Sequence, residues 1–161
     1  MYRTDNRLTM NESISSNEKQ SKMKIYLDID GVLLTTKNTK TVFNAELFII
    51  FLVNSFDCYW LTTHCKGDVK PTIRYLEQFF DSEIVEFLKR IKATNWNTLK
   101  TEAIDFNSDF YWLDDNPFKS EIKVLEKFGL KDRLLTVDLN RNDEHDKLMS
   151  FLKSKKGKEL L

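Results

Sequence analysis

The sequence predicts an α/β protein with a parallel sheet, and three observations lead to this fold class. Short apolar segments alternate along the chain with longer segments that carry a helical pattern of apolar residues. The short segments are apolar on both faces, which is typical of parallel strands covered by helices on either side. The chain also contains only 4 glycines and 2 prolines, a composition that favours regular structure over loops.

The expected strands are short apolar segments at residues 24–27, 58–62, 110–113 and 134–137. The apolar stretch over 44–54 also fits a strand, but parallel neighbours need a crossover, which favours a helix. Residues that can cap a helix precede most of the helical segments. The expected helices are 44–54 with Asn44 as cap, 69–80 with Asp68, 82–91 with Asp81, a short helix over 100–104 with Asn97, a helix with Pro117 in its first turn that stops at Gly129, and a last helix to about 153 with Asn142. This order predicts a three-layer, doubly wound parallel sheet of the Rossmann-like type.

Length and composition indicate one globular domain. A chain of 161 residues can bury a sizeable core but is too short for two ordinary domains. Lys and Arg number 25 and so do Asp and Glu, so net charge gives no sign of a nucleic-acid or anionic membrane partner. Cys58 and Cys65 provide neither a disulfide framework nor the spacing of a metal knuckle, which favours a reducing compartment. The longest apolar run, over 45–53, is far below the roughly 20 residues that span a bilayer, and no signal peptide is visible, so we expect a cytoplasmic protein.

The chain divides into three expected parts. Residues 1–22 are polar with few apolar side chains, so they cannot offset the entropy of ordering, and we expect a disordered extension. Residues 23–154 form the predicted domain. Residues 155–161 form a basic tail in solvent.

Two aspartates follow the first expected strand directly. Asp28 and Asp30 are separated by one residue and precede Gly31. Strand side chains alternate, so both carboxylates should share one face at the end of the strand, where open α/β sheets hold their ligands. Two carboxylates about 4 Å apart repel by roughly 4 kcal/mol at an effective dielectric near 20, so their pairing favours a bound cation or a shared proton. The alternative is a strand that ends in an ordinary polar turn.

Polar groups also follow the second and third expected strands. Thr62 and Thr63 follow an apolar strand, and Asp114 and Asp115 follow another, with Lys100 on a short helix before them. Each has an ordinary structural explanation: a turn, a solvated lysine and a helix-capping pair of acids. Together they predict a pocket with four acids, a hydroxyl and a cation.

In this order, the four segments resemble the motifs of the haloacid dehalogenase superfamily of aspartate-nucleophile phosphohydrolases. The first motif is matched by YLDIDGVL and the second by YWLTT. The third, a lone lysine, is matched by Lys100 in WNTLKTEAI, and the fourth by FYWLDD. The first and fourth motifs are specific, and the resemblance covers Lys24 to about Pro117.

The resemblance implies a phosphomonoesterase that works through an aspartyl-phosphate. Asp28 would be the nucleophile, and Asp30 would protonate the leaving alcohol and then accept a proton from water. Thr62 and Lys100 would hold the phosphoryl oxygens. Thr63 is the alternative phosphate ligand if the strand ends one residue later.

The resemblance also implies a magnesium site. Asp114 would bind Mg²⁺ with the Asp28 carboxylate and the Asp30 main-chain carbonyl, and Asp115 would steady these ligands.

Lys92 is the alternative to Lys100, although it lies farther from the paired acids. His64 and Cys65 allow a cysteine nucleophile, but neither has a plausible third partner.

The spacing of the motifs bears on the substrate. Between Asp28 and Thr62, and between Thr62 and Lys100, the expected loop and helices fill the chain, so neither stretch holds a cap domain. In the resembled family, a capless site favours a large substrate, such as a phosphoprotein or a nucleic-acid end, or a partner that completes the pocket. YWLTT and FYWLDD are also similar to small capless domains associated with RNA-repair proteins, although zero net charge gives that similarity no support.

Two other classes compete with a phosphatase. A signalling receiver domain also gathers acids, a threonine and a lysine, but it places its paired acids first and its lysine last. A catalytically idle scaffold would keep the fold and the metal, yet both Asp28 and Asp30 are present here.

Overall fold

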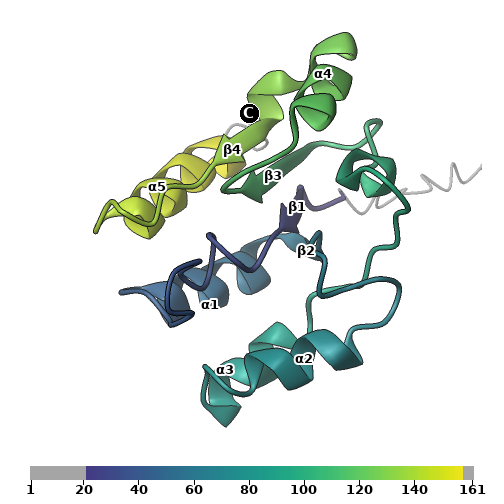
Figure 1. The fold of residues 1–161 in the computed structure, drawn as a ribbon. Coiled ribbons are helices and arrows are strands. Elements are labelled where there is room, and N and C mark those ends of the chain that lie inside the picture. The colour runs from purple at the N-terminus through teal and green to yellow at the C-terminus, as the bar shows by residue number, and fades with distance from the viewer. Residues whose placement is uncertain (1–20, 158–161) are drawn as a thin grey trace, which may run out of the picture.

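The computed structural model describes residues 21–157, and within this range the chain forms an α/β fold around a parallel sheet (Figure 1). The sheet has four strands in the order β2-β1-β3-β4, and every pair of neighbours is parallel. The strands are β1 (Lys24–Leu27), β2 (Asp57–Trp60), β3 (Phe110–Asp114) and β4 (Leu134–Thr136). The prediction of an α/β protein with a parallel sheet is confirmed, and the arrangement is compatible with a Rossmann-like fold.

Helices connect the strands, as parallel pairing requires. They are α1 (Ala45–Ser55), α2 (Lys70–Leu76), α3 (Ser82–Leu88), α4 (Lys119–Lys127) and α5 (Glu144–Lys156), with the 3₁₀ helices η1 (Lys100–Ala103) and η2 (Lys131–Arg133). The chain pairs β2 with one side of β1 and then crosses to place β3 on the other side. The carboxyl end of β1 therefore lies at a switch point between two connections that diverge, where open α/β sheets bind ligands.

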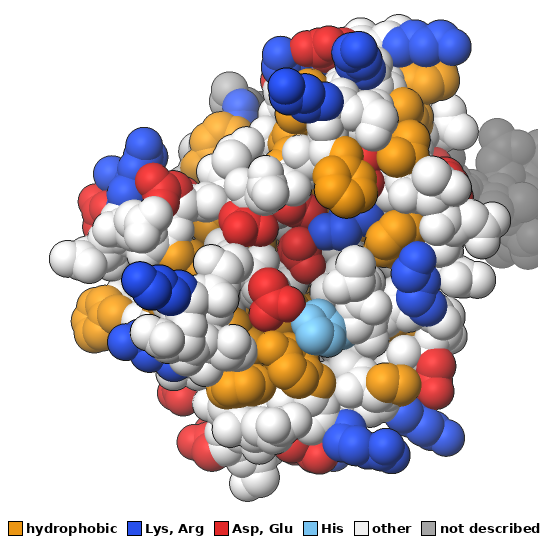
Figure 2. Space-filling model, in the orientation of Figure 1, with side chains coloured by type: hydrophobic (Ala, Val, Ile, Leu, Met, Phe, Trp, Pro, Cys, Tyr) orange, Lys and Arg blue, Asp and Glu red, His pale blue; other side chains and the backbone are white. Residues whose placement is uncertain are grey.

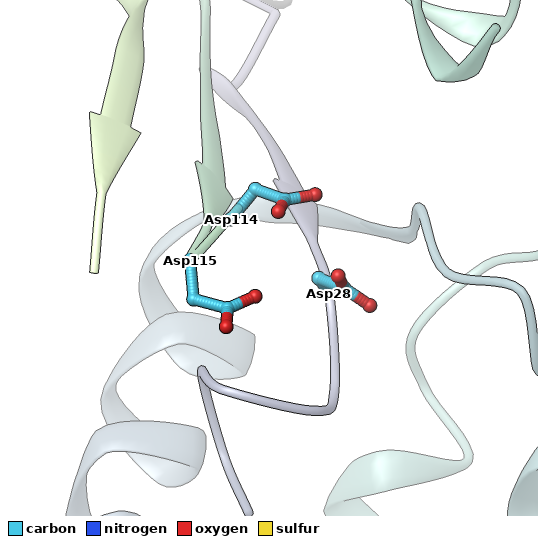
Figure 3. Close-up of side chains that lie close together, drawn as sticks. All are labelled: Asp28, Asp114 and Asp115. Carbon is cyan, nitrogen blue, oxygen red and sulfur yellow. The ribbon is translucent and has the colours of Figure 1, made fainter. Parts of the chain in front are cut away.

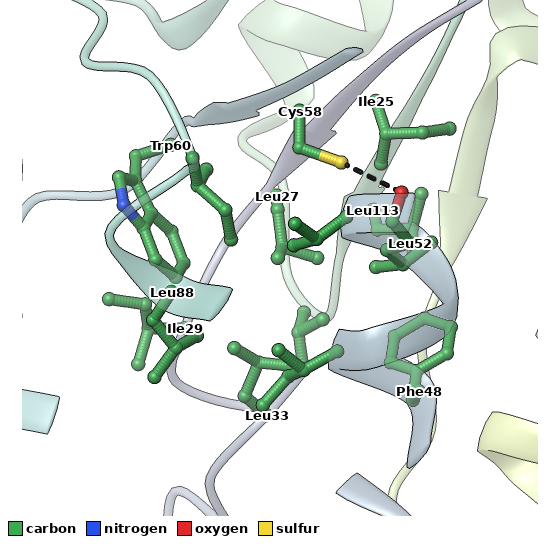
Figure 4. Packing of buried hydrophobic residues seen from close by; sticks show 14 of the residues in the cluster. Ile25, Leu27, Ile29, Leu33, Phe48, Leu52, Cys58, Trp60, Leu88 and Leu113 are labelled. Atoms are coloured by element: carbon green, nitrogen blue, oxygen red, sulfur yellow. Dashed lines mark hydrogen bonds between the residues drawn. The ribbon is translucent and has the colours of Figure 1, made fainter. Parts of the chain in front are cut away.

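Alternate side chains of β1 enter two hydrophobic clusters. Ile25 and Leu27 belong to the larger cluster, which packs residues of α1, α3 and α5, whereas Tyr26 belongs to a smaller one that includes Leu125 of α4. Figure 4 shows Leu52 of α1 close to the strand residues, with the Cys58 thiol donating to its carbonyl oxygen at 3.4 Å. Burial on both faces fits the apolar sequences of the two central strands, β1 from Ile25 and β3 up to Leu113.

The first two expected helix caps are wrong, and the third is confirmed. Asn44 precedes α1, but its backbone is left-handed with φ 65°, and its side-chain amide donates to Asp146 instead of accepting from the helix. Val69 is the residue at the start of α2, and Asp68 lies one position earlier, where its carboxylate accepts from the Lys70 amide. Asp81 does cap α3, because its carboxylate accepts from the Ile84 amide at 3.1 Å.

The later helix starts also differ from expectation. Leu99, not Asn97, precedes η1, because the Asn97 amide donates to the Glu102 carboxylate and stays outside the helix. Pro117 lies before α4 and not in its first turn. Asp143, not Asn142, precedes α5.

Several helices and strands end at other residues than expected. α2 ends at Leu76, since a turn with buried Phe80 leads directly into the Asp81 cap, and α3 ends at Leu88. β2 ends at Trp60, two residues before Thr62. α4 ends at Lys127, and Gly129 with φ 69° turns the chain away, as expected.

The expected chain ends lie mostly outside the described residues. Residues 1–20 of the expected disordered extension and residues 158–161 of the expected basic tail are among those not described. α5 continues to Lys156, so residues 155 and 156 are helical and do not belong to a separate tail. None of the helices in the described part has the length and apolar character needed to cross a membrane.

Candidate functional site

Asp28 follows the last residue of β1, in the middle of the sheet. Its main-chain amide donates to the Leu113 carbonyl of β3 at 3.1 Å, which continues the pairing of the two strands. One carboxylate oxygen accepts from the Ile29 amide at 2.8 Å, and the other lies 2.8 Å from the Lys100 ammonium. The side chain is therefore held in one orientation and is buried.

Asp114 is the last residue of β3, the strand beside β1. Its Oδ1 accepts from the Asn116 amide at 2.9 Å, and its Oδ2 lies 2.6 Å from the Lys100 ammonium. Its side chain is 2% exposed. Burial, together with the nearby Asp28 charge, raises the pKa of the Asp114 carboxyl, while Lys100 opposes this rise.

Asp115 completes a group of three carboxylates. Oxygen atoms of Asp28, Asp114 and Asp115 all lie within 4.8 Å of one another, and Figure 3 shows the three side chains at the ends of β1 and β3. Gly31 is required here, because a Cβ atom at this position would overlap the Asp115 carboxylate. Gly31 also has φ +78°, a backbone conformation that glycine adopts without strain.

Lys100 is the first residue of η1 and reaches both strand ends. Its ammonium bridges Asp28 and Asp114, and its side chain is 13% exposed. Burial acts to lower the pKa of this ammonium, but the two carboxylates outweigh burial and raise it. Lys100 is therefore a fixed positive charge between two acids.

Glu121 of α4 is a buried acid that the sequence reasoning missed. One of its carboxylate oxygens accepts from the Lys100 main-chain amide at 2.7 Å, and the other accepts from the Phe118 amide at 2.8 Å. It thereby fixes the start of η1 against the segment that follows the paired acids. Its position three residues after Phe118, at the start of a helix, is a signal that could have identified it as a capping acid.

The two threonines after β2 differ in exposure. Thr62 is 0% exposed, whereas Thr63 is exposed, although both residues lie beyond the end of β2 at Trp60. The Thr62 hydroxyl oxygen accepts from the His64 amide at 3.3 Å, an interaction that leaves the hydroxyl proton for another acceptor. In the described chain, neither threonine forms a hydrogen bond to the Asp28 or Asp114 carboxylate.

Asp30 lies outside the group of three carboxylates. Its Oδ2 lies 2.8 Å from His64 Nε2, and its Oδ1 accepts from the Tyr75 hydroxyl at 3.3 Å. The metal role that the resemblance implies for Asp30 involves its main-chain carbonyl, not this carboxylate. Neither His64 as a partner of Asp30 nor Tyr75, which comes from α2, was predicted from the sequence.

The alternative residues are placed elsewhere. Lys92 pairs with Asp57, the first residue of β2, at the opposite edge of the sheet from Asp114. The Cys65 thiol is buried and donates to the Asp68 carbonyl at 3.5 Å, while the His64 ring contacts Asp30. The geometry therefore offers no Cys65–His64 pair for a thiol nucleophile among residues 21–157.

The donor set fits a hard divalent cation. Three carboxylates offer only oxygen ligands, which suits Mg²⁺ better than metals that prefer nitrogen or sulfur. The pKa of the Asp115 carboxyl, like that of Asp114, is raised by burial and then by its acidic neighbour. A cation placed among these acids would offset the cost of burying their charges and the repulsion between them.

The space beside the acids is open. Figure 2 shows acidic side chains gathered in a hollow of this face next to a cationic and a histidine side chain. A cleft of about 590 Å³ is lined by Gly31 and Asp115, by the loop over 35–40 and by residues 136–140. A ligand at the carboxylates could thus extend past this loop into solvent.

Fold and site together define an α/β protein with a lysine-bridged acidic centre at the carboxyl edge of a parallel sheet. Comparisons of the chain with protein-family models, curated proteins and solved structures found no match.

Proposed function

We propose that this chain is a Mg²⁺-dependent phosphomonoesterase that forms an aspartyl-phosphate on Asp28. The observation that carries the proposal is the Lys100 ammonium, which lies 2.8 Å from Asp28 and 2.6 Å from Asp114 at adjacent strand ends. A positive charge here can stabilise a phosphoryl group at the Asp28 carboxylate before and after transfer. The order of the four motifs supports the same reaction.

The first step is a displacement at phosphorus. An Asp28 oxygen forms a bond to phosphorus as the bond to the leaving oxygen breaks, and Asp30 gives that oxygen a proton. In the second step, water attacks the aspartyl-phosphate and gives its proton to Asp30, which frees inorganic phosphate and restores the Asp28 carboxylate and the protonated Asp30 carboxyl. Thr62, with its hydroxyl proton available, and Lys100 would hold the phosphoryl oxygens.

The carboxylates of Asp28, Asp114 and Asp115 would hold Mg²⁺, which supplies charge neutralisation at the phosphoryl oxygens when bound. Asp115 would keep this place because Gly31 leaves room for its side chain. We also propose the three-layer, capless form of the fold, in which the open cleft admits a phosphate on a large molecule such as a phosphoprotein or a nucleic-acid end. The two free cysteines support our expectation of a cytoplasmic location.

The test compares wild type with Asp28→Asn and Asp28→Glu on 4-nitrophenyl phosphate and on a panel of phosphopeptides, nucleotides and phosphorylated oligonucleotides. We expect Mg²⁺-dependent release of phosphate by wild type, and a loss of about 10⁴-fold or more in both variants, as for nucleophiles elsewhere. Equal rates in wild type and Asp28→Asn would remove the nucleophile. A folded wild-type protein that binds Mg²⁺ and hydrolyses none of the panel would favour the idle scaffold instead.

A further inference from the structure

Asp30 is held by two side chains that the reaction itself does not use. His64 Nε2 lies 2.8 Å from one carboxylate oxygen, and the Tyr75 hydroxyl donates to the other at 3.3 Å. The two rings also stack on each other, with centroids 4.2 Å apart and an interplanar angle of 11°. The two side chains that bind Asp30 are therefore also in contact with each other.

The pair is anchored in the fold. The His64 carbonyl accepts from the Thr72 hydroxyl at 2.7 Å, and Thr72 is fully buried. Tyr75 follows Thr72 by three residues on α2, so both lie on the same side of that helix. Phe79 packs edge-on against Tyr75 with ring centroids 5.3 Å apart, which adds a further contact to the Tyr75 ring.

The pair also connects Asp30 to the second strand end. The His64 amide donates to the Thr62 hydroxyl oxygen at 3.3 Å, so the segment that presents Thr62 also carries the ring that contacts Asp30. A carboxylate with one partner on each oxygen loses the freedom to rotate that a solvated aspartate has. Its direction is then set by α2 and the segment after β2.

We infer that His64 and Tyr75 are positioning residues that direct the Asp30 carboxyl toward the oxygen of the leaving group. The inference rests on the proposed phosphatase function and deepens it. It assigns α2 the task of orienting the proton donor. Proton donation matters most for leaving groups that are poor without a proton, so these substrates should depend most on the pair.

The experiment measures kcat/KM for 4-nitrophenyl phosphate, phenyl phosphate and an alkyl phosphate with His64→Ala, Tyr75→Phe and wild type. We expect losses of about 10-fold or more on phenyl and alkyl phosphate but only about twofold on 4-nitrophenyl phosphate, as partial loss of general acid catalysis predicts. His64→Gln, which keeps a side-chain donor, should recover part of the loss on the poor leaving groups.

Tyr59→Phe is the matched control. The Tyr59 hydroxyl donates to Asp57 at 2.8 Å, so this variant also removes a tyrosine–aspartate hydrogen bond, but at the opposite edge of the sheet. It should leave all three substrates unchanged. Circular dichroism and thermal unfolding establish that each variant is folded.

The following outcomes would overturn the inference. Equal losses on all three substrates would show that the pair has only a structural role, and unchanged rates in both variants would show no role. Absence of turnover by folded, Mg²⁺-loaded wild type would overturn the proposed function, and the inference with it. A wild type that is active but has the same leaving-group dependence as the variants would overturn the inference alone.

Discussion

The carboxyl and amino edges of the sheet each have a lysine paired with acid, and the two groups differ in exposure and in the number of acids. At the carboxyl edge, Lys100 is 13% exposed and contacts both Asp28 and Asp114. At the amino edge, Lys92 is 58% exposed, and its ion pair in the described chain is with one acid, Asp57, at 2.7 Å. Asp57 in turn accepts from the Tyr59 hydroxyl, so that acid is satisfied without a second cation.

The comparison shows why one of these lysines is a candidate for chemistry and the other is not. The pKa of both ammonium groups is raised, for Lys92 by a hydrogen bond to Asp57 in solvent and for Lys100 by two acids that overcome burial. Solvent screens the exposed pair, whereas the buried group keeps an excess of negative charge that a cation or a phosphoryl group can use. Two acids around one lysine leave a net charge, and one acid does not.

The largest expected effect comes from removing the Lys100 charge, and the same change at Lys92 is its comparison. Lys100→Met leaves two buried carboxylates without a countercharge, so the free energy of unfolding should fall by about 3–5 kcal/mol. Lys92→Met should change it by less than about 1 kcal/mol. Phosphatase activity should fall about 10²–10³-fold in Lys100→Met only. Urea unfolding and initial rates at saturating Mg²⁺ measure both effects, and similar results for the two variants would contradict the comparison.

Magnesium should stabilise the carboxyl edge. At 100 times its dissociation constant, Mg²⁺ should raise the free energy of unfolding by about 2.7 kcal/mol, because it binds the folded acids. The measurement is a thermal melt across a Mg²⁺ titration at constant ionic strength. Lys92→Met should keep this increase and Asp114→Asn should lose most of it; an unchanged wild-type melt would count against the metal site.

A glycine pair can test the packing beneath Asp115. Gly31→Ala should cost about 1–2 kcal/mol for its positive φ and should also displace Asp115, so the Mg²⁺-dependent stabilisation should shrink. Gly129 also has a positive φ, +69°, but a Cβ atom there would meet no atom within 4 Å. Gly129→Ala should therefore show the backbone cost alone. Retention of the full Mg²⁺ effect in Gly31→Ala would separate Asp115 from the metal site.

The smallest expected effect concerns the buried His145, whose pKa is lowered by burial, while the Val32 carbonyl, Glu144 and Asp146 act in the opposite direction. The His145 ring stacks on Phe48 and its Nε2 lies 2.7 Å from the Val32 carbonyl, and burial lowers the pKa of this imidazole below 6.5. The unfolded chain then binds more protons than the folded one, so stability should fall as pH drops below about 6.5. His145→Gln should weaken this dependence in melts between pH 7 and pH 5. His64→Gln, which changes the other histidine, is the control. Identical slopes in wild type and His145→Gln would contradict the assignment of this pH dependence to His145.

The strands could be predicted because their signal is local. Each is a short run that is apolar on both faces, and the two hydrophobic clusters account for that composition. Most helix starts could not, because contacts outside the capping pattern decide them. The Asn44 side chain donates to Asp146, 102 residues away, and the Asn97 amide donates to the Glu102 carboxylate, five residues ahead.

The candidate site divides in the same way. Asp28, Asp114 and Asp115 could be placed together because parallel strands end at one edge, and the structure brings them together. The orientation of Asp30 could not be predicted, since the Tyr75 hydroxyl reaches it from 45 residues away. The chemical roles of these residues remain predictions.

Glu121 links two segments at the carboxyl edge of the sheet. Because its two oxygens accept from the Lys100 and Phe118 amides, η1 and the chain that leaves β3 are fastened to the same turn of α4. Local opening of that turn would release the cation and the paired acids in a single cooperative event, so hydrogen exchange at both amides should report one common opening free energy.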